Sequence, residues 1–316
     1  MTPPEPCVCI TGPTACGKTE LALRLAEAVP AEIINMDSAI VYRGMDIGTA
    51  KPPAEVRSRV PHHLVDVLDP TEPYSAGRFA RDAGKAIEGI TTRGRLPLLV
   101  GGTLLYLRAL REGLADLPVA DEEIRRRLDE VAEREGWPAL HSRLATVDPE
   151  AARRIAATDR QRIQRALEVY ELTGESLSSL QARCGGARTL PVRAFALVPA
   201  DRSELARRIE RRFDAMVAAG FVEEVETLRA RGDLTAATPA MRAVGYRQIW
   251  AYLDGRYDWA EARQRALAAT RQLAKRQMTW LRADSHLELL PVPRHSALAS
   301  LLECLRAGGQ KRQKRP

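Results

Sequence analysis

The sequence GPTACGKT, residues 12–19, matches the phosphate-binding pattern G-x-x-x-x-G-K-[ST]. It lies between a short apolar segment, 8–11, which predicts a strand, and an amphipathic segment, 19–29, which predicts a helix. Backbone N–H groups of such a loop surround a phosphate, and the following helix points the positive end of its dipole at the same anion. The pattern therefore predicts that the chain binds a diphosphate or a triphosphate.

Individual side chains of this loop have predicted roles as well. Lys18 adds a positive charge to the anion site, and the hydroxyl of Thr19 can hold Mg²⁺, which is the cofactor that we expect. The predicted diphosphate- or nucleotide-binding residues are Gly12, Pro13, Thr14, Ala15, Cys16, Gly17, Lys18 and Thr19.

Short apolar segments recur between helical segments in the N-terminal third of the chain. Residues 32–34 and 96–100 predict two further strands. Short apolar strands separated by helices form parallel sheets that are covered on both faces. The expected fold class is therefore α/β, with a P-loop NTPase-like parallel sheet as its core and helices on both faces.

The pattern changes at Pro118. From there to Ala187 the sequence has helical periodicity, no strand pattern and many arginines, which predicts an inserted helical domain. The segment PVRAFALVPA, 191–200, predicts a return to the sheet. The expected organisation is 1–117, the first part of the core; 118–187, the helical insertion; 188–306, the second and mainly helical part of the core; and 307–316, a basic, disordered tail.

Asp37 is an acid placed at the end of a predicted strand. A typical P-loop ATPase has an acid at the end of an apolar strand, where it helps to hold Mg²⁺. The strand at 96–100 has no such acid, because it is followed by two glycines and Thr103. Ligands bind at the carboxyl ends of parallel strands, so we expect Asp37 to face the same pocket as Lys18. The alternative is that Asp37 only caps a helix or stabilises its loop.

The chain of 316 residues has 48 Lys and Arg against 41 Asp and Glu, a formal net charge of +7. This balance favours a polyanionic partner, although a compositional bias toward arginine explains it equally well. The five cysteines are few and unevenly placed, which favours reduced thiols and a cytoplasmic location. We expect no membrane association, because no apolar segment reaches membrane-spanning length.

Nine blocks of the sequence match one known family in order. They are GPTACGKT (12–19), DSAIVYRGMDIGTAKP (37–52), PHHLVDVLDP (61–70), YSAGRF (74–79), LLVGGTLLYLRAL (98–110), DRQRIQRALEVYELTG (159–174), RRFDAM (211–216), MRAVGYRQIW (241–250) and TRQLAKRQMTWLR (270–282). On these blocks the chain resembles, over nearly its whole length, the bacterial tRNA dimethylallyltransferases, also called tRNA isopentenyltransferases.

The resemblance implies a monomeric prenyl transferase. Dimethylallyl diphosphate would donate its five-carbon group to N6 of the adenine 3′-adjacent to the anticodon of a tRNA. The products would be N6-isopentenyladenosine and diphosphate. On this view the phosphate loop holds a prenyl diphosphate, and the term ATP-binding would describe the motif rather than the chemistry.

The resemblance also implies roles for individual residues. Asp37 would accept the N6 proton as the new bond forms. Lys18, Mg²⁺ on Thr19 and Arg212 would stabilise the leaving diphosphate. Thr103 matches a family position near the substrates, although it could simply cap the next helix.

The implied partner is the anticodon stem-loop, whose adenine must be flipped out for chemistry. Any one block of the family's tRNA-contact positions could be a solvated face of a helix, whereas four blocks in family order favour RNA contact by their side chains. The contact positions are Asp37, Ser38, Ala39, Ile40, Thr103, Arg125, Gln161, Arg162, Ile163, Gln164, Arg165, Arg242, Ala243, Val244, Gly245, Tyr246, Arg247, Lys275, Arg276, Gln277, Met278, Thr279, Trp280, Leu281 and Arg282.

Two other functions stay open from the sequence. One is a small-molecule P-loop kinase in which Asp37 binds the acceptor hydroxyl, and the other is a non-catalytic RNA-binding P-loop protein. The basic helical half of the chain argues against a small acceptor, because a small substrate does not need it. Lys18, Thr19 and Asp37 are all present, which argues for catalysis.

Cys16 departs from the family pattern, which usually has serine at this place in the loop. A thiol next to a helix N-terminus and close to Lys18 favours its reactive thiolate form. The alternative is that Cys16 is buried behind the loop and inert.

Overall fold

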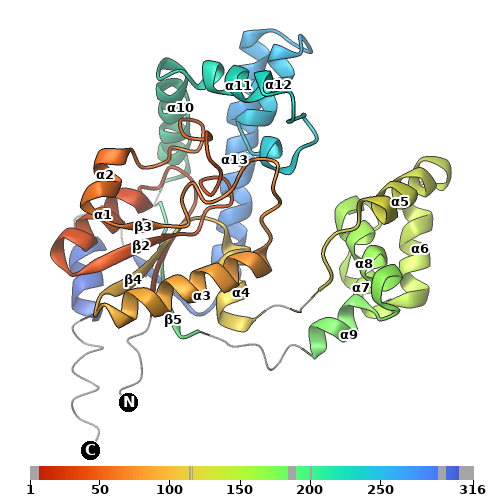
Figure 1. Ribbon diagram of the computed structural model, residues 1–316, viewed down its shortest axis with the longest axis horizontal. Coiled ribbons are helices and arrows are strands. Elements are labelled where there is room, and N and C mark those ends of the chain that lie inside the picture. The colour runs from red at the N-terminus through yellow and green to blue at the C-terminus, as the bar shows by residue number, and fades with distance from the viewer. Residues whose placement is uncertain are drawn as a thin grey trace, which may run out of the picture. The chain divides into compact units, whose positions relative to one another are not determined.

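The computed structural model describes residues 7–113, 115, 117–183, 190–199, 201–290 and 297–305 (Figure 1). By its internal contacts the chain forms two compact units, Met1–Arg111 with Leu190–Pro316, and Glu112–Thr189. The predicted basic tail, 307–316, lies outside the described residues. Among the helices described, none combines the length and the apolar character that crossing a membrane requires.

The first unit contains a six-stranded sheet in the order β3-β2-β4-β1-β5-β6, and the sequence predicts four of these strands. Every neighbouring pair is parallel, so the prediction of a parallel α/β fold is confirmed. The strands are β1 (Cys7–Thr11), β2 (Ala31–Asn35), β3 (His62–His63), β4 (Leu96–Val100), β5 (Val192–Leu197) and β6 (Leu287–Leu290).

The register brings the ends of three strands to one level of the sheet. Val100, the last residue of β4, pairs with Ile10 of β1 on one side and with Asn35 of β2 on the other. Because the strands are parallel, the segments that follow them emerge at the same edge. The phosphate loop, the segment with Asp37 and the segment with Thr103 therefore meet there.

Alternation along β1 explains how helices cover both faces of the sheet. Val8 and Ile10 point to one face, where they pack with Leu21 and Leu25 of α1 (Lys18–Ala28). Cys7 and Cys9 point to the other face and belong to the cluster formed with α3 (Ala76–Thr92) and α4 (Leu104–Glu112). A C-terminal helical segment, 297–305, packs on the α1 side.

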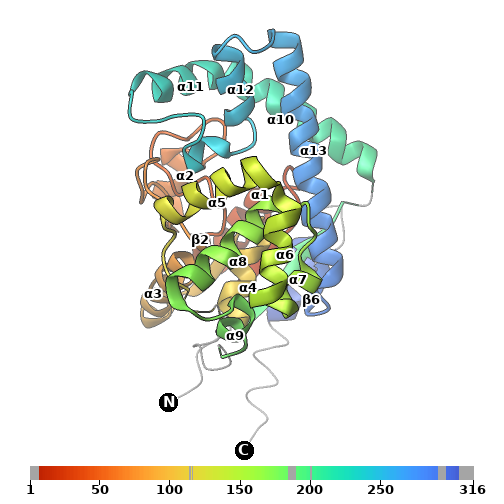
Figure 2. The same ribbon diagram turned by 90° about the vertical axis from the view of Figure 1, so that its right-hand side faces the viewer.

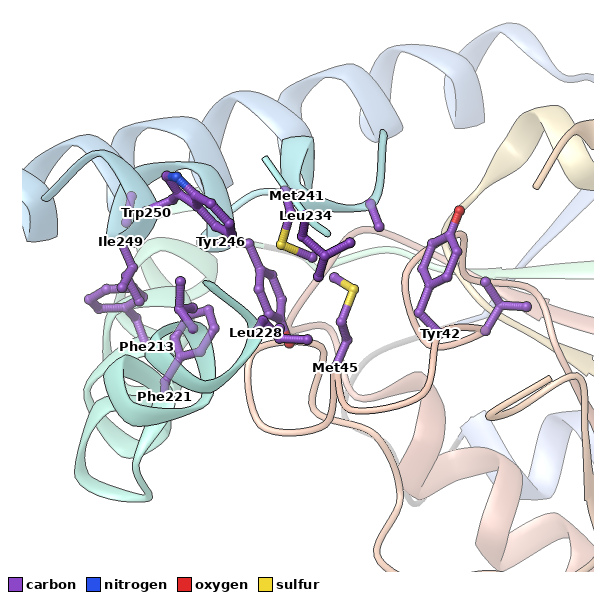
Figure 3. Close-up of a cluster of buried hydrophobic side chains, with 14 of the residues drawn as sticks. Tyr42, Met45, Phe213, Phe221, Leu228, Leu234, Met241, Tyr246, Ile249 and Trp250 are labelled. Carbon is purple, nitrogen blue, oxygen red and sulfur yellow. The ribbon is translucent and has the colours of Figure 1, made fainter. Parts of the chain in front are cut away.

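A second set of helices in this unit packs around the long segment that follows β2 (Figure 3). Tyr42 and Met45 from that segment share a buried cluster with Phe221, Tyr246 and Trp250. The segment also contains α2 (Ala54–Arg59). The helices of the second set are α10 (Arg202–Ala218), α11 (Phe221–Ala230), η1 (Pro239–Arg242), α12 (Tyr246–Leu253) and α13 (Trp259–Ala283).

The second unit is helical and has a core of its own (Figure 2). Asp121 caps its first helix by accepting a hydrogen bond from Ile124 N at 2.9 Å. Leu128, Leu144 and Ile163 are among the side chains in the core. The helices are α5 (Glu122–Glu135), α6 (Trp137–Val147), α7 (Pro149–Arg154), α8 (Arg160–Thr173) and α9 (Leu177–Ala182).

Glu32 of β2 is a buried carboxylate that binds His63 of β3 and Arg93 at the end of α3. Its side chain is 5% exposed. Arg93 donates to both oxygens, at 3.0 and 2.7 Å, and the His63 ring lies 2.7 Å from one of them. These hydrogen bonds, that of Arg93 first, outweigh burial and lower the pKa of Glu32 from 4.5 to about 2.

We predict that Glu32→Gln lowers the free energy of unfolding at neutral pH, because Arg93 loses its charged partner. A depressed pKa stabilises the fold above pH 4.5, and this stabilisation is lost as the pH falls toward 2. The gap between wild type and Glu32→Gln should therefore shrink over that range in urea denaturation. Glu88→Gln, at an exposed carboxylate of α3, is the control. A gap that is independent of pH would contradict the assignment.

Candidate active site

The phosphate loop turns sharply between β1 and α1, and its first glycine shows why. Gly12 has a φ of 150°, and a Cβ there would lie 2.5 Å from Leu197 O and 2.8 Å from Cys16 Sγ. Only glycine avoids both clashes. Because α1 begins at Lys18, its N-terminal N–H groups face the space that the loop encloses.

Lys18 and Cys16 lie close together in this loop, with Lys18 Nζ 3.9 Å from Cys16 Sγ. Lys18 Nζ donates to the carbonyl oxygens of Gly12 and Pro13, at 2.9 and 2.7 Å. Cys16 is 3% exposed and belongs to the apolar cluster between α1 and the sheet. The structure thus has the buried arrangement of Cys16 rather than the accessible one.

Asp37 is held at the end of β2 by the preceding Asn35. The Asn35 side-chain amide accepts from Asp37 N at 3.1 Å and donates to Asp37 O at 3.1 Å and to Leu64 O at 3.0 Å. One carboxylate oxygen of Asp37 accepts from Ala39 N at 3.0 Å. Asn35 therefore fixes the backbone of Asp37, a role that the sequence analysis missed.

Thr103 joins the segments that follow β2 and β4. Its hydroxyl oxygen accepts a hydrogen bond from Ser38 N at 3.2 Å, and its backbone N–H donates to Met36 O at 3.2 Å. Since its hydroxyl is directed to Ser38, Thr103 links the two strand ends next to Asp37.

Two cavities, of 1390 and 380 Å³, share a wall at these loops. The phosphate loop and Lys18 line the larger cavity, and Thr103 lines the smaller one. Their shared lining consists of Thr14, Ala15, Asp37, Thr49, Arg212, Met216, Leu273 and Gln277. Lys18 of the phosphate loop and Asp37 thereby line the same cavity.

Arg212 reaches this shared wall from α10. One of its guanidinium nitrogens donates to Thr49 O at 3.3 Å. Burial lowers the pKa of Arg212, while the charge of Asp37 opposes that shift. Arginine keeps its charge in proteins, so a cation stands beside Asp37.

Gln277 of α13 connects the phosphate loop to the end of β4. Its side-chain oxygen accepts from Thr14 N at 2.8 Å, and its side-chain nitrogen donates to Gly102 O at 3.0 Å. Trp280, one turn further along α13, is 41% exposed, whereas Leu281 is buried. Lys275, Arg276, Thr279 and Arg282 are exposed, and Met278 is half-buried.

The segment 242–247 also contributes to the smaller cavity. Arg242, Ala243, Val244, Gly245 and Tyr246 line it, and Arg247 is exposed. Tyr246 is fully buried, and its hydroxyl donates to Glu224 at 2.5 Å. Ser38 and Ala39 also line the smaller cavity, and Ile40 lines the larger one.

The predicted RNA-contact residues of the helical unit differ in their surroundings. Gln161 and Arg162 are exposed on α8, while Ile163 lies in the core. Arg125 and Arg165 both bind Glu168, whose side chain is fully buried, at 2.8 and 2.7 Å.

Gln164, the remaining residue of the α8 block, donates to Asp129 at 2.7 Å. Four residues of the predicted RNA-contact set, Ile163, Gly245, Tyr246 and Leu281, are buried. The side chains of Ile163, Tyr246 and Leu281 stabilise the packing of their helices. The exposed residues of α8, of the segment 242–247 and of α13 can face a partner molecule.

The described residues contain no group of three or more His, Cys, Asp and Glu side chains that could hold a metal ion. Thr19, however, is exposed and lines the larger cavity together with Lys18 and Asp37. Mg²⁺ is usually bound through few protein oxygens together with substrate phosphates and water. Thr19 therefore fits a Mg²⁺ ion that arrives with a diphosphate.

We predict that iodoacetamide labels Cys304 of the folded protein faster than Cys16, because Cys304 is partly exposed and Cys16 is buried. Peptide mapping after timed alkylation measures both rates, and alkylation in denaturant is the control in which both thiols should react. Labelling of Cys16 as fast as that of Cys304 in the folded protein would contradict this arrangement.

Comparisons with known proteins place this architecture in a family. A family model described as IPP transferase matches residues 40–284. A tRNA dimethylallyltransferase of Ralstonia pickettii (strain 12J) is 57% identical over 283 residues, 87% of each chain. A tRNA dimethylallyltransferase of Alkalilimnicola ehrlichii is 60% identical over 280 residues, 88% of each chain.

Solved structures agree with the sequence matches. The full-length tRNA isopentenylpyrophosphate transferase from Bacillus halodurans superimposes with a TM-score of 0.70 at 35% identity, covering 98% of this chain and 99% of that one. A eukaryotic dimethylallyltransferase acting on tRNA gives a TM-score of 0.75 at 28% identity, covering 90% of this chain and 73% of that one. The resemblance predicted from the sequence is confirmed, and the chain belongs to the IPP transferase family.

Proposed function

We propose that this protein transfers a dimethylallyl group from dimethylallyl diphosphate to N6 of the adenine 3′-adjacent to the anticodon in tRNAs. The products are N6-isopentenyladenosine and diphosphate. The observation that carries the proposal is the shared wall of the two cavities, where Asp37 and Arg212 lie next to the phosphate loop. The matched relatives, named for this transfer, support it.

The diphosphate occupies the larger cavity at the phosphate loop in this proposal. Loop N–H groups, Lys18 and Arg212 stabilise the charge that gathers on the leaving oxygen as the allylic C–O bond breaks. Lys18 donates to loop carbonyls, so its ammonium group must turn toward the diphosphate. Mg²⁺ on Thr19 would supply further charge neutralisation when it is bound.

The adenine enters through the smaller cavity, and Asp37 acts as general base. Its carboxylate accepts the N6 proton while the N6–carbon bond forms, because the adenine amine is a weak nucleophile. Thr103 positions Ser38 and the segment that carries this base. The flipped base would lie between the segments after β2 and β4 and the segment 242–246.

The tRNA is bound by the exposed residues of the family blocks in α8, α13 and the segment 242–247. Arginine and lysine there pair with phosphates, and Trp280 offers a stacking surface. We assign the chain to the P-loop NTPase-like folds, with 118–187 as an inserted tRNA-binding domain between the two core parts. We further propose a cytoplasmic, monomeric enzyme.

The kinase alternative lacks support, because the matched relatives are named for dimethylallyl transfer. The direct experiment incubates the protein with labelled dimethylallyl diphosphate and unmodified tRNA, in parallel with labelled ATP. Label should pass from the prenyl donor to tRNA. Efficient phosphorylation of a small molecule by ATP, with no prenyl transfer, would restore the kinase hypothesis.

We predict that Asp37→Asn lowers kcat by about 10²–10⁴-fold, since a general base typically contributes that much. The Kd for tRNA should stay close to that of wild type, because an amide keeps the shape of the carboxylate. Steady-state prenylation and filter binding measure the two quantities. Near-wild-type turnover in this variant would remove Asp37 as the base.

We predict that Arg162→Ala weakens tRNA binding and leaves the affinity for dimethylallyl diphosphate intact. Arg162 is 66% exposed on α8, so its removal does not strip a buried partner. The slope of log K against log salt should become shallower by about one unit for each RNA phosphate that the variant no longer binds. Arg153→Ala, at an exposed arginine of α7 outside the family block, is the control. An equal weakening of tRNA binding in the two variants would argue against a specific role of Arg162.

A further inference from the structure

The segment 46–51, which follows β2, forms a wall of both cavities. Asp46 and Ile47 line the larger cavity, Gly48 lines the smaller one, and Thr49 lines both. Such a segment can move on its own unless its backbone is held, because it contains no regular helix or strand.

Three successive backbone N–H groups of this segment point to one carboxylate, that of Glu224 in the first turn of α11. Asp46 N and Ile47 N donate to one oxygen at 2.9 and 2.7 Å, and Gly48 N donates to the other at 3.1 Å. Charge-assisted hydrogen bonds of this kind are stronger than neutral ones. One side chain therefore fixes three consecutive peptide groups.

Tyr246 adds a fourth hydrogen bond to this carboxylate. Its hydroxyl donates to Glu224 at 2.5 Å, and its ring is fully buried beside Phe221 (Figure 3). Burial, together with the neighbouring charge of Glu224, raises the pKa of Tyr246, so the phenol stays a donor at physiological pH.

Gly48 is required for this close approach. A Cβ at this position would lie 2.0 Å from the Phe221 ring and 2.7 Å from the Tyr246 ring. The absence of a side chain lets the backbone lie against both aromatic rings, within reach of Glu224.

The held segment connects to the reacting groups through its next residue. Thr49 O accepts a hydrogen bond from Arg212 at 3.3 Å, and Arg212 shares the cavity wall with Asp37. At the far end of the segment, Lys51 donates to Tyr42 O at 2.8 Å and pairs with Asp46 and Asp66. Glu224 and Lys51 thus anchor the segment on both sides of Thr49.

We propose that Glu224 is a positioning residue for the transfer reaction: by holding the N–H groups of residues 46–48, it places Thr49 O so that Arg212 is aimed at the diphosphate. This inference rests on the proposed function, because Arg212 acts on the leaving diphosphate there. Glu224 itself touches neither substrate.

The test compares Glu224→Gln with Glu223→Gln, the same change at the exposed neighbour on α11. A glutamine amide offers one acceptor oxygen, so it cannot serve all three N–H groups. Prenyl transfer to tRNA is measured at varied dimethylallyl diphosphate, with the folded enzyme counted by active-site titration. For Glu224→Gln we expect kcat/KM for dimethylallyl diphosphate to fall about 10- to 100-fold, since small misplacements have effects of that size. The Kd for tRNA and all constants of Glu223→Gln should match wild type.

A purely structural role would lower the melting temperature of Glu224→Gln and leave its constants per folded molecule unchanged, and that result would overturn the proposal. If Glu224→Gln does not fold, Tyr246→Phe decides, because it removes only the hydroxyl bond to the carboxylate. The Tyr246→Phe substitution should lower kcat/KM for dimethylallyl diphosphate by about threefold or more. Wild-type constants in Tyr246→Phe would then overturn the proposal. Absence of prenyl transfer by the wild type would instead reject the proposed function.

Discussion

The site depends on one constraint, the parallel register that brings the ends of β1, β2 and β4 to the same level of the sheet. Val100 pairs with both Ile10 and Asn35, so three connecting segments leave the sheet at one edge. One supplies backbone N–H groups and Lys18, the second Asp37, and the third Thr103. Backbone hydrogen bonding thereby brings a carboxylate and the phosphate loop to the same place.

Side chains from distant parts of the sequence then fix these segments. Asn35 holds Asp37, Gln277 ties the phosphate loop to the end of β4, and Glu224 holds the wall of the cavities. Each is a polar side chain that forms hydrogen bonds with backbone groups of these segments. Catalysis by charge stabilisation requires groups that are fixed before the substrate arrives, and these contacts supply that rigidity.

Much of the sheet could be predicted from the sequence, because continuous apolar segments such as 8–11 and 96–100 are typical of buried parallel strands. The two edge strands could not. β3 is only two residues long, and β6 has the partly exposed sequence LELL, so neither has the apolar pattern of a central strand. The strand order also depends on packing between distant segments, which periodicity does not contain.

The site was predictable where a local pattern carries the chemistry, as in the phosphate loop and Asp37. The roles of Asn35 and Glu224 could not be predicted, because they arise from contacts that sequence spacing does not indicate. Glu224, for example, binds N–H groups that lie 176 to 178 positions away in the sequence. The exposure of individual side chains likewise could not be predicted. The predicted RNA contacts therefore included the buried residues Ile163, Tyr246 and Leu281 together with exposed ones.

In the proposed reaction, Asp37 accepts the proton of the adenine amine, and the phosphate loop binds the diphosphate that leaves. A crystal structure of the protein with an unreactive dimethylallyl diphosphate analogue and an anticodon stem-loop tests it most directly. We expect the diphosphate on the loop N–H groups beside Lys18 and Arg212, and an Asp37 oxygen within about 3.2 Å of the adenine N6. A diphosphate bound away from the loop, or an N6 group facing a different base, would contradict it.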